Sequence, residues 1–397
     1  MELKAEDRLI LSCIKINPTP NELEQINDLI PEIQNWDYLI STIIDRGIGP
    51  LLHKKLPLLT NSLLIPETVQ SKLQQVYYKT FSRSTILYDH FRKIAVAFIS
   101  QNIPVIALKG IYLSEWLYQD IGLRQFSDID LLVKEEDSAK CITILSDFGY
   151  KTSESDMSEF VLAEIENDIV HYAPMVLHGV SIELHINLHR KTEKYKVIIP
   201  VLWENSIPAS VNGMQIKALN TNDLLIHLCL HLDKHFWIGK VQFTCFNDIT
   251  NVLEQFSNTM NWSEFIESCK FYKCDEIVFK YIVLIHKYMN ASVPSYIIHK
   301  YKFLLMKRDE HLFCCYLKGS LDTSITLSAH IGYLKNVHSF FDKVRYLRDI
   351  LFPSKAFMIQ RYQIKNSTYV LLYYPYRYYI GIMGVLNYLK RKVVFRN

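Results

Sequence analysis

A chain of 397 residues with 49% hydrophobic and 21% charged residues has the composition of a globular protein and is long enough for two or three domains. Glycine and proline, at 12 and 13 residues, are too few for a mainly disordered protein. The net charge of +3 hides an asymmetry, because residues 342–397 hold eleven Lys or Arg against two Asp or Glu, a local charge of +9, which leaves about −6 on the remainder. Such a basic tail can bind phosphates, nucleic acid or a membrane surface, or it can be an ordinary solvated helix.

Residues 1–100 are expected to be helical, because apolar residues recur there at helical spacing. The apolar run at 103–108 then predicts a buried strand that ends at Lys109-Gly110. Further along, we expect a short helix at 111–117, a strand at 129–133, and an amphipathic helix at 138–148 that ends at Gly149. This order of strand, helix, strand and helix indicates an α/β unit.

The clearest prediction is a strand at 180–189, where apolar residues alternate with Glu183, His185, Asn187 and His189. Period-two alternation places these four polar side chains on one face of the strand, which is either exposed to solvent or the floor of a site. From Asn222 onward the pattern is helical again.

Cysteine usage and the N-terminus point to a reducing setting. None of the eight cysteines forms a C-x-x-C pair, and Cys269 and Cys274 have no second pair nearby, so we do not expect the cysteines to form a zinc site. The N-terminal segment is charged and amphipathic and lacks the long apolar run of a signal peptide. We therefore expect reduced thiols and a cytoplasmic protein.

Asp128 and Asp130 lie two residues apart on a predicted strand, so their carboxylates point to the same side. Carboxylates so placed can hold paired Mg²⁺ ions, which stabilise the attacking and leaving oxygens in phosphoryl and nucleotidyl transfer. The dipeptide spacing is common by chance and does not define a metal site by itself.

The residues upstream of the two aspartates strengthen the metal hypothesis. Gly110 stands where a strand leads into a helix, and a phosphate can approach the backbone there. Lys109 can meet triphosphate charge, and Arg124 can clamp a phosphate with two hydrogen bonds. The alternatives are that Gly110 is only a turn, that Lys109 is solvated, and that Arg124 pairs with a nearby acid.

The stretch ALKGIYLSEWLYQDIGLRQFSDIDLLV resembles the catalytic signature of the DNA polymerase β-like nucleotidyltransferase superfamily. There, a strand and a Gly-containing turn precede a helix and a strand that bears Asp-x-Asp, and a third carboxylate lies on a later strand. More closely, L-K-G, L-R-x-x-S-D-I-D-L-L-V, the I-E-L-H strand and a His-rich helix resemble an uncharacterised bacterial nucleotidyltransferase-like family. The resemblance covers roughly residues 80–260.

This resemblance implies roles for particular residues. Asp128, Asp130 and Glu183 would be the catalytic carboxylates and the ligands of Mg²⁺ or Mn²⁺, and Glu183 is also a candidate base for the attacking hydroxyl. The nucleotide-binding residues would be Lys109, Gly110, Arg124 and Ser127. Because Lys109-Gly110-Ile111 stands where the superfamily has Gly-Ser, one serine contact to phosphate is missing and Lys109 is expected to replace it.

The implied fold is α+β. A small mixed β-sheet, the nucleotidyltransferase core at 101–220, would lie between a helical N-terminal lobe at 1–100 and a helical C-terminal lobe at 221–397 with a basic, Tyr-rich tail. The cleft is expected to face the C-terminal helices.

Three histidines recur every four residues on a predicted helix, at His227, His231 and His235, so they lie near one stripe. They can bind zinc, line a substrate cleft, or cap a buried face. His185 shares the presumed face of Glu183 and is expected to orient that carboxylate or to contact the substrate. Asp248 is expected on a solvated helix surface, and the alternative is that it supports the residues of the site from behind.

The segment 369–389 is as long as a membrane span, but it holds Pro375 and Arg377 near its middle. Because a charge at the bilayer centre is unfavourable, we expect a buried or interfacial helix pair. The basic residues 390–392 that follow leave peripheral membrane contact open. The many tyrosines, with Arg377, are also compatible with nucleic-acid stacking, although a packed helix contact explains them more simply.

The expected function is transfer of a nucleoside monophosphate from a nucleoside triphosphate, with ATP the expected donor, to an unidentified small molecule, peptide or protein. Pyrophosphate would be released. The missing Gly-Ser motivates one alternative, a non-catalytic nucleotide- or partner-binding protein on the same fold. The basic tail motivates a second, an RNA-directed nucleotidyltransferase.

Overall fold

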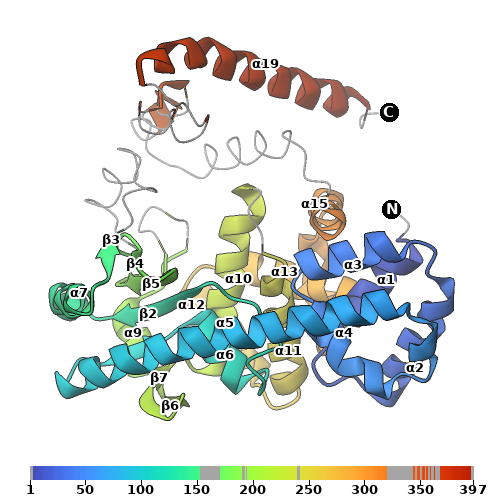
Figure 1. Ribbon diagram of the computed structural model, residues 1–397, viewed down its shortest axis with the longest axis horizontal. Coiled ribbons are helices and arrows are strands. Elements are labelled where there is room, and N and C mark those ends of the chain that lie inside the picture. Colours follow the sequence, from blue (N-terminus) through green and yellow to red (C-terminus); the bar gives the residue numbers. More distant parts are fainter. Residues whose placement is uncertain are drawn as a thin grey trace.

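The computed structural model describes residues 3–152, 170–189, 193, 195–238, 242–319 and 367–394, together with scattered residues between 343 and 362. Its centre is a mixed seven-stranded sheet with the order β3-β4-β5-β2-β1-β7-β6. Helices lie beside this sheet and beyond one end of it (Figure 1). The predicted α+β class is therefore confirmed.

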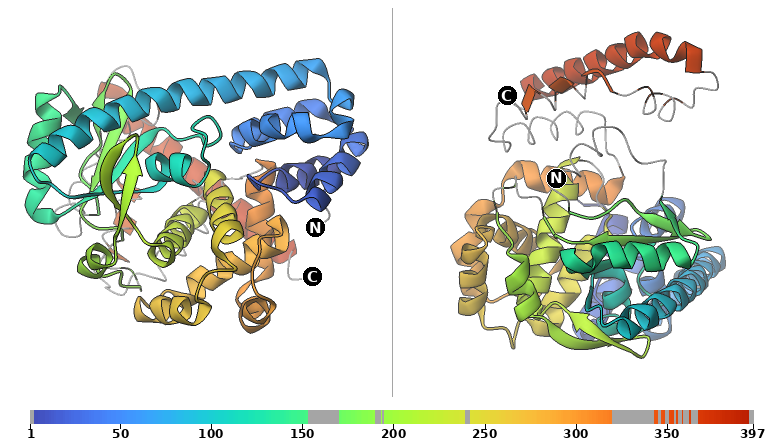
Figure 2. Two further views of the ribbon diagram at one scale, coloured as in Figure 1. Left: turned by 90° about the horizontal axis from the view of Figure 1, so that it is seen from below. Right: turned by 90° about the vertical axis from the view of Figure 1, so that its left-hand side faces the viewer.

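The first hundred residues are helical, as expected. Their helices are α1 (Ala5–Ser12), α2 (Pro20–Leu29), α3 (Trp36–Asp45), α4 (Gly49–Lys55) and α5 (Glu67–Ser100), with short 3₁₀ turns η1 (Ile30–Glu32), η2 (Leu56–Leu58) and η3 (Thr60–Leu64). α2 begins where sequence chemistry favours it: Thr19 and Glu22 form a capping box, and Pro20 occupies the first turn. The 34-residue α5 runs from this helical part along one face of the sheet (Figure 2).

The strands are β1 (Val105–Ala107), β2 (Asp128–Val133), β3 (Lys151–Thr152), β4 (Met175–Leu177), β5 (Val180–His185), β6 (Ile207–Val211) and β7 (Met214–Ala218). The central pair β2 and β5 is parallel, whereas β1 is antiparallel to β2 and parallel to β7. The outer pairs β4–β5 and β6–β7 are hairpins closed by His178-Gly179 and Asn212-Gly213. All four turn residues have positive φ, the signature of two-residue type I′ turns.

β5 is shorter than the strand predicted at 180–189, because it ends at His185. The backbone amides of Ile186 and Asn187 both donate to the carbonyl of Val170, each at 3.1 Å, so the regular ladder stops there. The expectation that four alternating polar residues share one strand face is therefore wrong for Asn187 and His189, which lie beyond the strand.

The remaining helices of the main body are α6 (Lys109–Trp116), α7 (Ser138–Asp147), α9 (Ile199–Glu204), α10 (Thr221–Ile238), α11 (Thr244–Phe256), α12 (Trp262–Phe271), α13 (Asp275–Met289), α14 (Ser295–Tyr301) and α15 (Lys307–Lys318), with 3₁₀ turns η4 (Glu135–Asp137) and η6 (Lys302–Leu304). Gly149 follows α7 with a φ of +91°, the left-handed conformation expected after a helix end. One continuous apolar core runs from Leu9 to Leu317 through the sheet. The division into three parts stays a prediction.

Residues 367–394 form the 3₁₀ turn η7 (Ser367–Tyr369) and the single helix α19 (Val370–Val394). The expectation of a helix pair is therefore wrong: Pro375 lies inside the helix, and the turns on either side continue through it. α19 lies apart from the main body (Figure 1), and its packing belongs to a separate small apolar cluster around Met358 and Val370. None of the helices in the described part of the chain has the length and apolarity of a membrane-spanning segment.

Candidate active site

The predicted carboxylates meet on the two central parallel strands. Asp128 opens β2, and Asp130 follows two residues later with its side chain on the same side. In the β2–β5 register, Asp130 pairs with Glu183, while Asp128 pairs with Ser181. An apolar run predicted β2 and alternation predicted β5, and the parallel pairing of these strands brings the third carboxylate beside the second.

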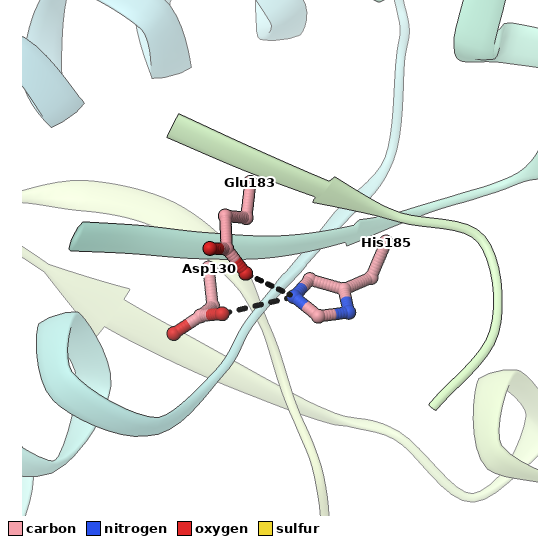
Figure 3. A group of neighbouring side chains, drawn as sticks. All are labelled: Asp130, Glu183 and His185. Atoms are coloured by element: carbon pink, nitrogen blue, oxygen red, sulfur yellow. Dashed lines mark hydrogen bonds and ion pairs between the residues drawn. The ribbon is translucent and has the colours of Figure 1, made fainter. Parts of the chain in front are cut away.

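His185 joins these carboxylates from the end of β5 (Figure 3). Its Nε2 lies 2.9 Å from Oδ1 of Asp130 and 3.6 Å from Oε2 of Glu183. Potential ligand atoms of Asp130, Glu183 and His185 all lie within 4.8 Å of one another. Two carboxylates and one imidazole at this separation form a donor set that a divalent cation can use, and the oxygens suit Mg²⁺ or Mn²⁺.

Lys109 is the ammonium of the cluster. Its Nζ lies 2.8 Å from Oδ1 of Asp130 and 3.4 Å from Nε2 of His231 on α10. The residue opens α6 with a φ of +42°, a left-handed conformation that costs a non-glycine residue about 1 kcal/mol or more. The backbone amide of Leu108 donates to the carbonyl of Asp130 at 3.0 Å, which ties the start of α6 to β2.

The charges of the cluster shift one another's pKa values. Burial opposes ionisation of Asp130, but Lys109 and His185 hold its pKa well below the usual range. Burial likewise opposes the charge on Glu183, but a hydrogen bond from His185 lowers its pKa. The pKa of His185 is raised, because these carboxylate bonds outweigh its burial. Burial and the neighbouring Asp130 raise the pKa of Asp128 to about 6.

The histidine stripe extends from this cluster along α10. The ring centroids of His227 and His231 are 6.1 Å apart, and those of His231 and His235 are 4.5 Å apart. His189, just beyond β5, lies 5.8 Å from His227. Lys109 thus links the carboxylates of the sheet to a band of histidines on the helix opposite.

His227 is the most unusual member of this band. It is buried, and neither ring nitrogen has a hydrogen-bond partner among the described residues. Burial lowers the pKa of His227 and of His231 well below the usual range, so both imidazoles are neutral near pH 7. A neutral imidazole offers one donor and one acceptor, and leaving them unmet in a folded interior costs free energy that a bound polar group would recover.

The guanidinium of Arg124 is already bound to another carboxylate, that of Asp248. Its Nε and Nη2 donate to the two oxygens of Asp248 at 2.9 and 2.7 Å, and Tyr118 donates to the same carboxylate at 2.9 Å. Asp248, on α11, is only 1% exposed, so the expectation of a solvated surface residue is wrong. The geometry favours the alternative in which Arg124 pairs with an acid, and a phosphate-binding role for it stays a prediction.

Gly110 and Ser127 both make structural contacts that do not involve a nucleotide. A side chain at Gly110 would meet the ring of Phe126 at 2.8 Å, so close packing already explains the glycine. Ser127 is exposed, and its carbonyl accepts from Nη2 of Arg83 at 3.0 Å. Their nucleotide-binding roles stay predictions.

Sequence reasoning missed Arg83 entirely. The same Nη2 of this residue of α5 also donates to the carbonyl of Gly179 at 2.7 Å, so one guanidinium fixes the segments leading into β2 and into β5. It also missed the pairing of Arg124 and Tyr118 with Asp248. These partners are more than 120 positions apart, so no local spacing could reveal the contact.

Comparison with known proteins identifies the family of the chain. Residues 32–290 match the family described as uncharacterised nucleotidyltransferase, which is more than half of the chain. The chain belongs to this family, so it is a nucleotidyltransferase, and the resemblance seen in its motifs is confirmed. A nucleotide substrate follows from this membership.

Two solved structures are similar to about half of the chain. One is the solution structure of the antibiotic-resistance factor ANT(2'')-Ia, with 12% identity and a TM-score of 0.34 over 52% of this chain and 99% of that one. The other is an antigenic nucleotidyltransferase-like protein from Paracoccidioides brasiliensis, with 13% identity and a TM-score of 0.25 over 54% of this chain and 96% of that one. No curated protein matches the chain.

Proposed function

We propose that this chain transfers a nucleoside monophosphate from a nucleoside triphosphate, with ATP the expected donor, to a hydroxyl-bearing acceptor and releases pyrophosphate. The observation that carries the proposal is the register of β2 and β5. It sets Asp130 beside Glu183 on parallel strands, with Asp128 on the same face of β2. Three carboxylates gathered in a largely buried site are unfavourable unless cations balance them.

The residues fit a divalent metal. Asp130, Glu183 and His185 have ligand atoms close enough to share one ion, and the carboxylate oxygens match Mg²⁺ or Mn²⁺. Asp128, on the same face of β2 but outside this group, would complete the carboxylate set. A metal bound there would neutralise the charge of the triphosphate during transfer.

The chain's own residues would position both substrates. Lys109 is the ammonium next to Asp130, so we assign it the triphosphate oxygens that a serine would otherwise bind. Glu183 is kept ionised by His185 and is the candidate acceptor of the attacking hydroxyl's proton.

We propose that the acceptor substrate binds against the histidine band. The neutral ring of His227 can donate one hydrogen bond and accept another, which suits a hydroxyl compound. The ring of His231 is already engaged, with Nε2 at 3.4 Å from Nζ of Lys109 and Nδ1 at 3.8 Å from Sγ of Cys245. Lys109 contacts His231, and this positive charge disfavours a cationic acceptor. His185 and His235 complete the proposed substrate-facing set.

The test measures pyrophosphate release from each of the four nucleoside triphosphates with Mg²⁺ or Mn²⁺, with a host extract as the pool of acceptors. Three proteins are compared: the wild type, Asp130→Asn, and the matched surface control Asp89→Asn, whose side chain is 58% exposed. We expect release by the wild type and by Asp89→Asn, with one triphosphate preferred, and none by Asp130→Asn.

Equal release by Asp130→Asn would contradict the assignment of the carboxylates. If no protein releases pyrophosphate, calorimetric titration with each triphosphate decides between the remaining possibilities. Metal-dependent binding to the wild type alone would support the nucleotide site and turn the search to the acceptor. Absence of both release and metal-dependent binding would overturn the proposal in favour of a non-catalytic partner-binding role.

A further inference from the structure

One face of α19 exposes large apolar side chains. The exposed fractions are Leu371 67%, Leu372 69%, Tyr376 53%, Tyr379 61%, Ile382 59% and Met383 39%. At 3.6 residues per turn, these six positions fall within about 140° of the helix circumference. They therefore form one continuous stripe, which we call the α19 apolar face.

The opposite side of α19 is the side that packs. Val370 is 1% exposed and packs with Met358, and Tyr373 and Tyr374 lie against this pair. The hydroxyl of Tyr374 donates to the carbonyl of Pro353 at 2.6 Å. The helix is therefore anchored to its own segment through one side, and nothing in the described part of the chain covers the α19 apolar face.

The charge around this face is of one sign. Residues 350–397 contain eight Lys or Arg and no Asp or Glu. Three of the basic residues, Lys390, Arg391 and Lys392, follow one another near the helix end. The main body carries the compensating negative charge, so the field of this segment attracts an extended anionic surface.

We propose that α19 docks on the surface of an anionic lipid bilayer, with its apolar face at the level of the acyl chains and its basic residues at the headgroups. A helix that combines an apolar stripe with a cluster of Lys and Arg binds in this way. Tyrosine, abundant in α19, is a residue that concentrates at the membrane–water interface.

Two other partners fit the face less well. A single-stranded nucleic acid stacks on aromatic rings and pairs with cations, but it does not need the exposed aliphatic residues Leu371, Leu372 and Ile382. A second copy of the chain would bring another segment with the same positive charge against this one, and like charges oppose that contact. An anionic bilayer satisfies the apolar face and the charge together.

The experiment is co-sedimentation of the full chain with vesicles of phosphatidylcholine alone or with about a third phosphatidylglycerol, at low and high salt. The test variant is Leu372→Glu with Ile382→Glu. The matched control is Leu63→Glu with Leu64→Glu, which adds the same charge at leucines that are 91% and 56% exposed on η3 of the main body. Circular dichroism checks that each variant is folded.

We expect the wild type and the η3 control to bind anionic vesicles at least about tenfold more tightly than neutral ones, with binding weakened by salt. The α19 variant should bind anionic vesicles at least about tenfold more weakly than the wild type.

Three results would overturn the proposal. The first is no wild-type binding to anionic vesicles at low salt, and the second is equal binding by the α19 variant. The third is absence of vesicle binding together with either RNA binding or a concentration-dependent dimer that the α19 substitutions abolish. That result would assign the face to nucleic acid or to a second copy.

Discussion

Asp130 and Asp248 are both buried carboxylates, but their surroundings differ in charge balance. Asp248 accepts two hydrogen bonds from the single guanidinium of Arg124 and a third from Tyr118, so one negative charge meets one positive charge. At Asp130, Lys109 and His185 converge on one oxygen, and two further carboxylates stand beside it. The matched pair is what a structural contact requires, whereas the surplus of negative charge is what a cation or a phosphate-bound metal would complete.

The largest expected effect is a loss of activity at the Asp130 site, where negative charge is in surplus. Asp130→Asn should lower the rate of nucleotidyl transfer by at least about a hundredfold, because it removes a charge that the proposed metal and Lys109 both contact. The free energy of unfolding should also fall, because Lys109 and His185 lose the carboxylate that both contact, so circular dichroism checks that the variant is folded. A variant that keeps full turnover would show that the charge surplus at Asp130 has no catalytic role.

The next largest effect is a loss of stability at the Arg124–Asp248 ion pair, where the charges are balanced. Asp248→Asn should lower the free energy of unfolding by about 3–5 kcal/mol, because it leaves the buried Arg124 guanidinium without its counter-charge. The double variant Arg124→Leu with Asp248→Leu should recover part of this loss, since neither charge then remains buried. Urea titration measures both. A loss below about 1 kcal/mol in Asp248→Asn would mean that Arg124 finds another partner, and a phosphate role for it would then regain support.

This contrast also shows what the sequence could and could not predict. Apolar runs predicted β1 and β2, and periodicity predicted the start of β5 and the helix that carries the histidine stripe, because both kinds of pattern are local properties of the sequence. The resemblance of the Asp-x-Asp and I-E-L-H segments predicted the three carboxylates, because these motifs are also local in the sequence. The roles of Arg124 and Asp248 depend on a contact between a loop and α11, and that contact is set by tertiary packing alone. The early end of β5 likewise depends on Val170, ten residues before the strand begins.

Two substitutions of Lys109 distinguish the effect of its charge from the effect of its backbone conformation at the Asp130 site. Lys109→Gly and Lys109→Met both remove the ammonium, but only glycine accepts a φ of +42° without strain. The glycine variant should therefore be more stable to urea than the methionine variant by about 1–2 kcal/mol. Both should bind triphosphate equally weakly in calorimetry. If the glycine variant binds as well as the wild type, the backbone turn and not the ammonium holds the phosphates.

Lys55 extends the comparison to a buried cation with no carboxylate paired to it among the described residues. Its Nζ donates to the carbonyls of Cys13 and Leu51, and burial lowers its pKa from 10.5 to about 8. Between these two pH values the unfolded chain keeps the proton that the folded chain has lost, so raising the pH favours the folded state. The stability of the wild type relative to Lys55→Met should therefore rise from pH 8 upward, by at most about 1.4 kcal/mol per pH unit. Urea titrations of both proteins across this range measure the difference, in which the titration of groups remote from Lys55 cancels. Parallel stability curves would mean that Lys55 keeps its charge in the folded protein, and backbone carbonyls alone would then suffice to hold a buried cation.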